Sequence, residues 1–88
     1  MFKRIDTLIK LLSLYRGNNY KGEEIVIIVG LAALSELRAR ARSWVCREYN
    51  GLETFGGARL ILEPERDPRY IAIAYRGDNR YNYITEIT

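Results

Sequence analysis

The chain has 88 residues, of which 14 are Lys or Arg and 11 are Asp or Glu, so its net charge is +3 at pH 7. This length fits a single domain, and a composition of 48% hydrophobic and 28% charged residues is typical of a folded globular protein, not of a disordered segment. There is no histidine and only one cysteine, which excludes an internal disulfide and removes the commonest general base and metal ligand. The longest apolar run, residues 25 to 34, is too short to cross a bilayer, so we expect a cytoplasmic protein without a membrane segment, metal or cofactor.

The first half of the chain begins with a helical pattern. Apolar residues at three- and four-residue spacing predict an amphipathic helix over residues 2 to 16, followed by turn residues from Gly17. Residues 22 to 30 carry two glutamates, Glu23 and Glu24, near their start and close with a glycine, which favours a second helix. The β-branched run inside this segment, Ile25 to Val29, is also compatible with a buried strand, and a strand there would make the fold an α+β sandwich.

A third helix is predicted over residues 33 to 49, with Asn50 and Gly51 as its C-cap pair. On a helical wheel, Leu37 and Trp44 fall on one side, whereas a strand would leave Trp44 among arginines. The opposite, outer side carries small residues. The arginines border that outer side along two edges, Arg38 and Arg42 on one and Arg40 and Arg47 on the other.

The second half of the chain is β in character. Apolar-rich runs predict strands over residues 58 to 63, 69 to 76 and 81 to 87, the first two joined by a loop with two prolines. The predicted fold class is therefore α+β, with three helices followed by an antiparallel β-hairpin or a three-stranded meander.

Three helices followed by a hairpin, with a basic third helix, resemble the winged helix-turn-helix family, and its small members from phages and other mobile elements in particular. The resemblance covers about residues 5 to 76 and rests on YKGEEIVIIVG as the second helix and LSELRARARSWVCREYNGLET as the recognition helix. It implies a third helix in the DNA major groove and a wing near the backbone or the minor groove.

The function implied by this resemblance is double-stranded DNA binding, by a small transcriptional regulator or a recombination accessory factor. Arginines would neutralise phosphates while small side chains face the bases. The predicted contacts are Ser35, Arg38, Ala39, Arg40, Arg42, Ser43 and Arg47 on the third helix, and Arg66 and Arg69 on the wing.

The alternative is a protein-interaction module, such as a viral host-targeting protein or inhibitor, which would use the arginine face and the tyrosine-rich last strand. Tyr81 and Tyr83 would lie on an edge strand, so a homodimer through residues 80 to 88 is a further prediction. The acidic residues show no catalytic pairing, and we expect neither an enzyme nor a small-molecule substrate.

Overall fold

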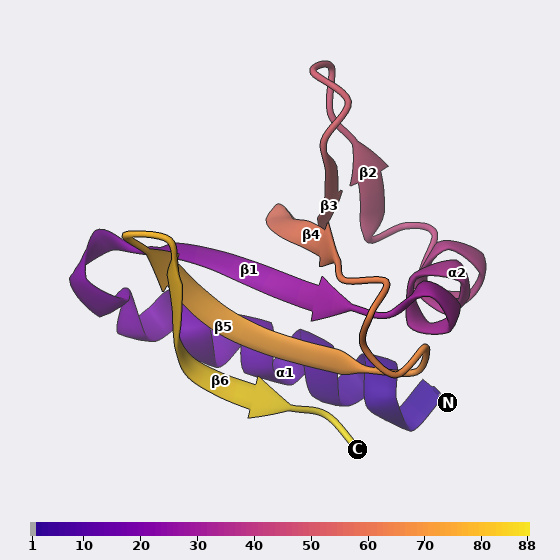
Figure 1. Ribbon diagram of the computed structural model, residues 1–88, viewed down its shortest axis with the longest axis horizontal. Coiled ribbons are helices and arrows are strands. Elements are labelled where there is room, and N and C mark those ends of the chain that lie inside the picture. The colour runs from indigo at the N-terminus through magenta and orange to yellow at the C-terminus, as the bar shows by residue number, and fades with distance from the viewer. Residues whose placement is uncertain (1) are drawn as a thin grey trace.

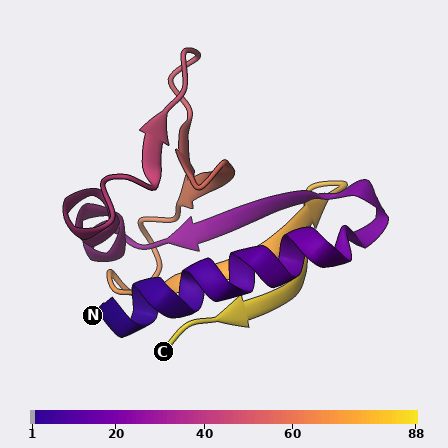
Figure 2. The same ribbon diagram turned by 180° about the vertical axis from the view of Figure 1, so that it is seen from behind.

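The computed structural model describes residues 2–88 and shows an α+β fold in which a six-stranded mixed sheet carries a long helix on one face (Figures 1 and 2). The elements in chain order are α1 (Phe2–Asn18), the 3₁₀ turn η1 (Tyr20–Gly22), β1 (Glu24–Val29), α2 (Leu31–Arg40), β2 (Val45–Arg47), β3 (Glu53–Phe55), β4 (Ala58–Leu62), β5 (Ile71–Gly77) and β6 (Arg80–Glu86).

The strands follow the order β2-β3-β4-β1-β5-β6 across the sheet. Strand β1 lies in the middle, parallel to β4 and antiparallel to β5. All other neighbours are antiparallel, so β2 and β6 form the two edges of the sheet.

Helix α1 covers one face of the sheet with its apolar stripe (Figure 2). Leu8 and Leu12 on this stripe are at most 1% exposed, as is Ile27 on the facing side of β1. Burial of this size, rather than intrinsic helix propensity, is what stabilises a 17-residue amphipathic helix. The cluster between α1 and the sheet also includes Ile5, Tyr15, Val29, Phe55, Ile71, Ile73 and Tyr75.

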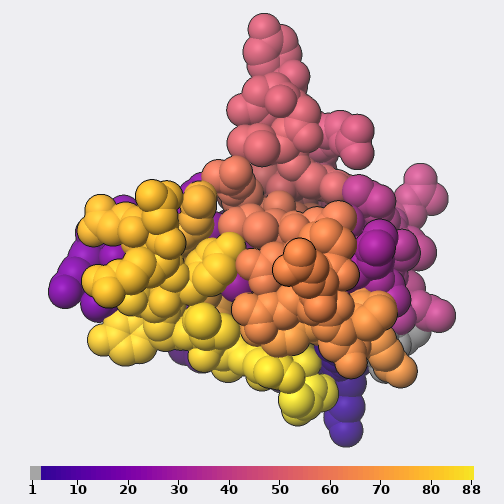
Figure 3. Space-filling model, in the orientation of Figure 1, coloured from indigo at the N-terminus to yellow at the C-terminus, as the bar shows by residue number. Residues whose placement is uncertain are grey.

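The opposite face of the sheet is covered by the segment that links β4 to β5 and by side chains of the sheet itself. Val26, Ile28 and Ala74 point to this side and are fully buried, with Ile61, Tyr70 and Tyr81 packed against them. In Figure 3 the orange and yellow part of the chain covers this face. The central strand β1 is therefore buried on both faces.

The second predicted helix is wrong. Residues 22 to 30 instead form the end of η1, the strand β1 and Gly30, the N-cap of α2. The five apolar residues from Ile25 to Val29 contain no polar position that could face solvent, as a surface helix would require. Strand β1 is covered on one face by the cluster under α1 and on the other by the cluster with Ile61, Tyr70 and Tyr81, and strands buried on both faces are continuously apolar.

The third predicted helix is wrong in its second half. Helix α2 ends at Arg40, because Ala41 leaves the helical region at φ −126° and ψ 44°. The chain then turns, with the Trp44 amide donating to the Ala41 carbonyl at 2.9 Å, and enters β2. Asn50 and Gly51, predicted as a helix cap, lie in the turn between β2 and β3.

The predicted meander is also wrong, and with it the arrangement of three helices followed by a hairpin. Strand β1 separates β4 from β5, so the loop with the two prolines connects strands that are not neighbours. The helix predicted over residues 2 to 16 and the strands predicted over 58 to 63, 69 to 76 and 81 to 87 do occur, as α1, β4, β5 and β6. Within residues 2–88, no helix combines the length and apolar character needed to span a membrane.

Candidate nucleic-acid interface

A short hairpin made of β2 and β3 projects from the body of the protein (Figures 1 and 3). Its strands pair in the register Val45 with Phe55 and Arg47 with Glu53. The turn is closed by a hydrogen bond of 2.6 Å from the Glu48 amide to the Leu52 carbonyl oxygen. Because residues 48 to 52 lie beyond the paired strands, the tip of the hairpin stands clear of the sheet.

The base of the hairpin is fixed to the core. The Trp44 ring stacks on Phe55 with 5.5 Å between the ring centroids, and Phe55 is fully buried. Gly56 lies under the Trp44 ring with a φ of 57°, and a Cβ atom there would come within 2.7 Å of that ring. The position therefore requires glycine both for its backbone and for the space it leaves to the tryptophan.

Four arginines lie on the elements that lead into the hairpin and on its first strand. Arg38 and Arg40 are in the last turn of α2, Arg42 is in the following turn and Arg47 is on β2. All four are exposed. Residues 38 to 55 contain these four arginines and two glutamates, a net charge of +2 in a chain whose total is +3.

One of the two glutamates is held by an arginine. Arg38 donates to both carboxylate oxygens of Glu53, at 2.8 Å from Nε and 2.7 Å from Nη2. This hydrogen bonding lowers the pKa of Glu53 and raises that of Arg38, and the charge of Arg47 lowers the Glu53 pKa further. Arg42 makes no hydrogen bond or ion pair with any other part of residues 2–88, so its guanidinium is available to a partner.

The other predicted contact residues are divided among several places. Ser35 and Ala39 are exposed on α2, whereas Ser43 is exposed in the turn that follows it, so these three do not form one helix face. Arg66 and Arg69 belong to the segment between β4 and β5 and not to a wing, because those strands do not pair.

Both loop arginines make local contacts, Arg66 through its side chain and Arg69 through its backbone. Arg66 pairs with Glu63 at 2.7 Å, and its guanidinium lies 4.6 Å from the centre of the Tyr70 ring. The Arg69 carbonyl oxygen accepts a hydrogen bond from the guanidinium of Arg4 on α1. The Arg66 contacts lie within the segment itself, and the Arg4 contact joins the backbone of the segment to α1.

Tyr49 is the exposed aromatic residue that the sequence did not single out. It lies in the hairpin turn and its side chain is fully exposed. The sequence does contain a pattern that could have located this residue, because Asn-Gly between two short apolar-polar runs is typical of a hairpin turn. The residue before such an Asn-Gly pair lies at the tip of the hairpin.

Neither a metal site nor a family can be assigned to the described residues from their side-chain clusters or from comparison with known proteins. Among residues 2–88, no group of three or more Cys, Asp or Glu side chains could hold a metal ion. Comparison of the chain with protein-family models, curated proteins and solved structures finds no match.

Proposed function

We propose that this protein binds double-stranded DNA through the basic hairpin, defined as β2, β3 and their turn together with Arg38, Arg40 and Arg42 at the base. The observation that carries the proposal is a projecting two-stranded ribbon with exposed arginines at its base and on β2. The major groove of B-DNA accepts a two-stranded ribbon as well as it accepts a helix. This mode differs from the one implied by the sequence, because the arginines lie on three consecutive elements and not on one helix.

Phosphate neutralisation would supply most of the binding free energy. Each phosphate neutralised by an arginine releases counterions, so the logarithm of the affinity falls with the logarithm of salt concentration by about 0.9 per contact. Three such contacts predict a loss of about 40-fold between about 50 and 200 mM salt. The arginines set the affinity, and polar side chains in the groove, such as Ser43, would contribute to sequence preference.

The test is a titration of a fluorescently labelled mixed-sequence duplex, followed by anisotropy at both salt concentrations. The double variant Arg42→Ala/Arg47→Ala is expected to weaken binding at least tenfold and to reduce the salt slope by about 2. The matched control, Lys10→Ala/Arg80→Ala, removes the same charge from exposed positions on α1 and β6. Equal losses in the two double variants would show a non-specific effect of net charge, and the hairpin assignment would be wrong.

A role in transcription regulation or recombination in the cytoplasm is part of the same proposal. Selection of preferred sites from a random duplex pool would test it, because a regulator needs a sequence preference that phosphate contacts alone do not provide.

Pairing of two copies along β6 is a second candidate function, favoured by one observation. Strand β6 is an edge of the sheet, and Tyr83 and Ile84 on it are 65% and 49% exposed. An edge strand can add a strand from another chain through its backbone groups, and such a contact responds little to salt. A homodimer through residues 80 to 88 would show twice the monomer mass in light scattering at tens of micromolar, at low and high salt alike. A monomer under both conditions would contradict it.

A further inference from the structure

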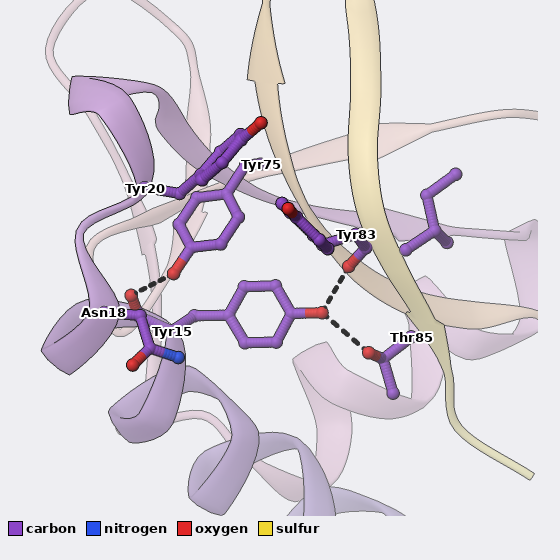
Figure 4. Close-up of a pocket in the computed structure, with 7 residues that line it drawn as sticks. Tyr15, Asn18, Tyr20, Tyr75, Tyr83 and Thr85 are labelled. Carbon is purple, nitrogen blue, oxygen red and sulfur yellow. Dashed lines mark hydrogen bonds between the residues drawn. The ribbon is translucent and has the colours of Figure 1, made fainter.

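A pocket lined with tyrosines opens on the α1 side of the sheet, where the C-terminal end of α1 meets β5 and β6 (Figure 4). Its volume is about 450 Å³, within the range of small-molecule sites. Tyr15, Asn18, Tyr20, Tyr75, Tyr83 and Ile84 line it. None of these residues belongs to the basic hairpin, so the pocket is a separate site.

Two of the tyrosines form a fixed floor. Tyr15 and Tyr75 are 8% and 3% exposed and stack with 4.8 Å between ring centroids. The Tyr15 hydroxyl donates to the Tyr83 carbonyl oxygen and lies 2.6 Å from Oγ1 of Thr85, as Figure 4 shows, and the Tyr75 hydroxyl donates to the Tyr15 carbonyl oxygen. The floor is therefore apolar on its ring faces and fully hydrogen-bonded at its polar atoms.

The other two tyrosines form the rim. Tyr20 and Tyr83 meet edge to face, with ring centroids 4.6 Å apart at 89°. Tyr83 is 65% exposed. Neither rim hydroxyl makes a hydrogen bond to another part of residues 2–88, so both can bond to a ligand.

Left-handed backbone conformations occur at one rim tyrosine and on both sides of the other. Tyr83 has a φ of 53°, an outlier for an aromatic residue, at an irregularity where β6 shifts register against β5. Tyr20 lies between Asn19 and Lys21, whose φ values are 43° and 46°. Each such residue that is neither Gly nor Asn costs on the order of 1 kcal/mol, and such strain clusters at ligand sites. The strain around this pocket therefore points to a ligand.

The chemistry of the lining favours a planar heteroaromatic ligand with an anionic group. Tyrosine faces stack on such a ring, and the Asn18 amide supplies both a donor and an acceptor for its edge. The lining contains no carboxylate to compensate a cation. Lys21 does not line the pocket, but its ammonium lies 5.2 Å from the centre of the Tyr20 ring, close enough to a bound nucleobase to pair with its phosphate. We propose that the tyrosine pocket binds a nucleobase that carries a phosphate, as a free nucleotide or as an unpaired nucleotide of a nucleic-acid strand.

Isothermal titration calorimetry of the whole chain tests this proposal with three probes: adenosine 5′-monophosphate, adenosine and a short single-stranded oligodeoxyadenylate. Binding of the monophosphate as tightly as the oligonucleotide would identify a free nucleotide as the ligand, and binding of the oligonucleotide alone would identify a strand. Adenosine is expected to bind more weakly than the monophosphate, and Lys21→Ala should remove that difference. No heat with either phosphate-bearing probe at millimolar concentration would overturn the proposal.

The decisive variant is Tyr83→Ala, and Tyr49→Ala is its control because Tyr49 is an exposed tyrosine outside the pocket. Loss of one stacked ring predicts a loss of about 5- to 150-fold in affinity for Tyr83→Ala and none for Tyr49→Ala. Tyr83→Gly guards against a folding artefact, because glycine adopts the φ of 53° without strain and should keep the chain folded while it abolishes binding. Equal effects of the two alanine variants would exclude the pocket. Arg42→Ala/Arg47→Ala should bind the monophosphate normally, so this test and the duplex test fail independently.

Discussion

Arg38 on α2 and Glu53 on β3 form a two-point ion pair that joins the end of the helix to the turn-side end of the projecting hairpin. The pair fixes Arg38 in one direction and cancels its charge. Glu53→Gln is therefore expected to strengthen DNA binding several-fold at about 50 mM salt, since it removes a negative charge and frees a cation beside the phosphates. The duplex titration measures this effect, and Glu65→Gln in the loop between β4 and β5 is the matched charge control. A weaker complex in Glu53→Gln would mean that the ion pair positions the hairpin for binding.

The same pair predicts a dependence of stability on pH. The Arg38 hydrogen bonds hold the pKa of Glu53 below its ordinary value, so the pair stabilises the folded state at pH values above the unfolded-state pKa. This contribution is lost as the pH falls through the lowered folded-state pKa. Because 46% of the Arg38 side chain is exposed, the pair contributes less than about 1 kcal/mol. Urea unfolding gives the free energy of unfolding at pH 7 and at pH 3. We expect this free energy to fall more between the two pH values in the wild type than in Glu53→Gln. Equal decreases would show that the pair contributes nothing.

Gly30 is predicted to be intolerant of any side chain. A Cβ atom at this position would lie 2.2 Å from the Asp67 carbonyl oxygen and 2.8 Å from the backbone of Pro68. The loop cannot yield without loss of the hydrogen bond from the Ala33 amide to the Pro68 carbonyl oxygen. We expect Gly30→Ala to reduce the free energy of unfolding by about 1–3 kcal/mol. At Gly17 on α1, an added Cβ atom would meet nothing within 4 Å, so Gly17→Ala should instead stabilise the protein by up to about 1 kcal/mol. Urea unfolding of the two variants measures both changes in the free energy of unfolding.

The packing of α1 is tested by two leucines on the same helix. Leu8 is fully buried against the sheet, whereas Leu14 is 62% exposed. Leu8→Ala is expected to destabilise by about 2–5 kcal/mol, because it removes buried methyl groups and leaves a cavity. Leu14→Ala should change the stability by less than about 0.5 kcal/mol. Thermal and urea unfolding of both variants measure these changes. If the two variants lost similar amounts of stability, α1 would have to pack on the sheet through a different face.

How much of the fold the sequence predicts depends on whether the signal is local. The periodicity of α1 and the runs of β4, β5 and β6 are local, and these elements occur where they are predicted. The run from Ile25 to Val29 was assigned by the charges and the glycine at its ends, although its unbroken apolar character indicated burial on both sides. Its place between β4 and β5 depends on pairing between distant segments, which local patterns do not encode.

In the candidate sites, too, local features can be predicted from the sequence and contacts between distant segments cannot. The exposed arginines from Arg38 to Arg47 are visible in the sequence, but their alternation spans the end of a helix, a turn and a strand. Asn50 and Gly51 are typical of a hairpin turn, but they were interpreted as a helix cap because the residues before them were predicted to be helical. The tyrosine pocket could not be predicted, because its four tyrosines come from α1, η1, β5 and β6, which are brought together only by the fold.

The hydroxyl of Tyr15 is predicted to hold the irregular part of β6 in place. It donates to the Tyr83 carbonyl oxygen and contacts Thr85, on either side of the exposed Ile84. Tyr15→Phe keeps the ring stacked on Tyr75 but leaves that carbonyl oxygen without its protein donor, so we expect a loss of about 1–3 kcal/mol. Tyr49→Phe should cost nothing, since Tyr49 is fully exposed.

Hydrogen exchange separates this local role from a general loss of stability. If the hydroxyl holds the bulge, amides of residues 83 to 86 should exchange faster in Tyr15→Phe by more than the global change in stability allows, while amides in β1 follow that global change. The rim of the pocket would loosen with the bulge, because Tyr83 depends on the left-handed backbone at that position. If the amides of β1 and β6 instead exchanged faster by the same factor, the hydroxyl would act only through the overall free energy of unfolding. The bulge would then be maintained by the pairing of β5 with β6 and not by the Tyr15 hydroxyl.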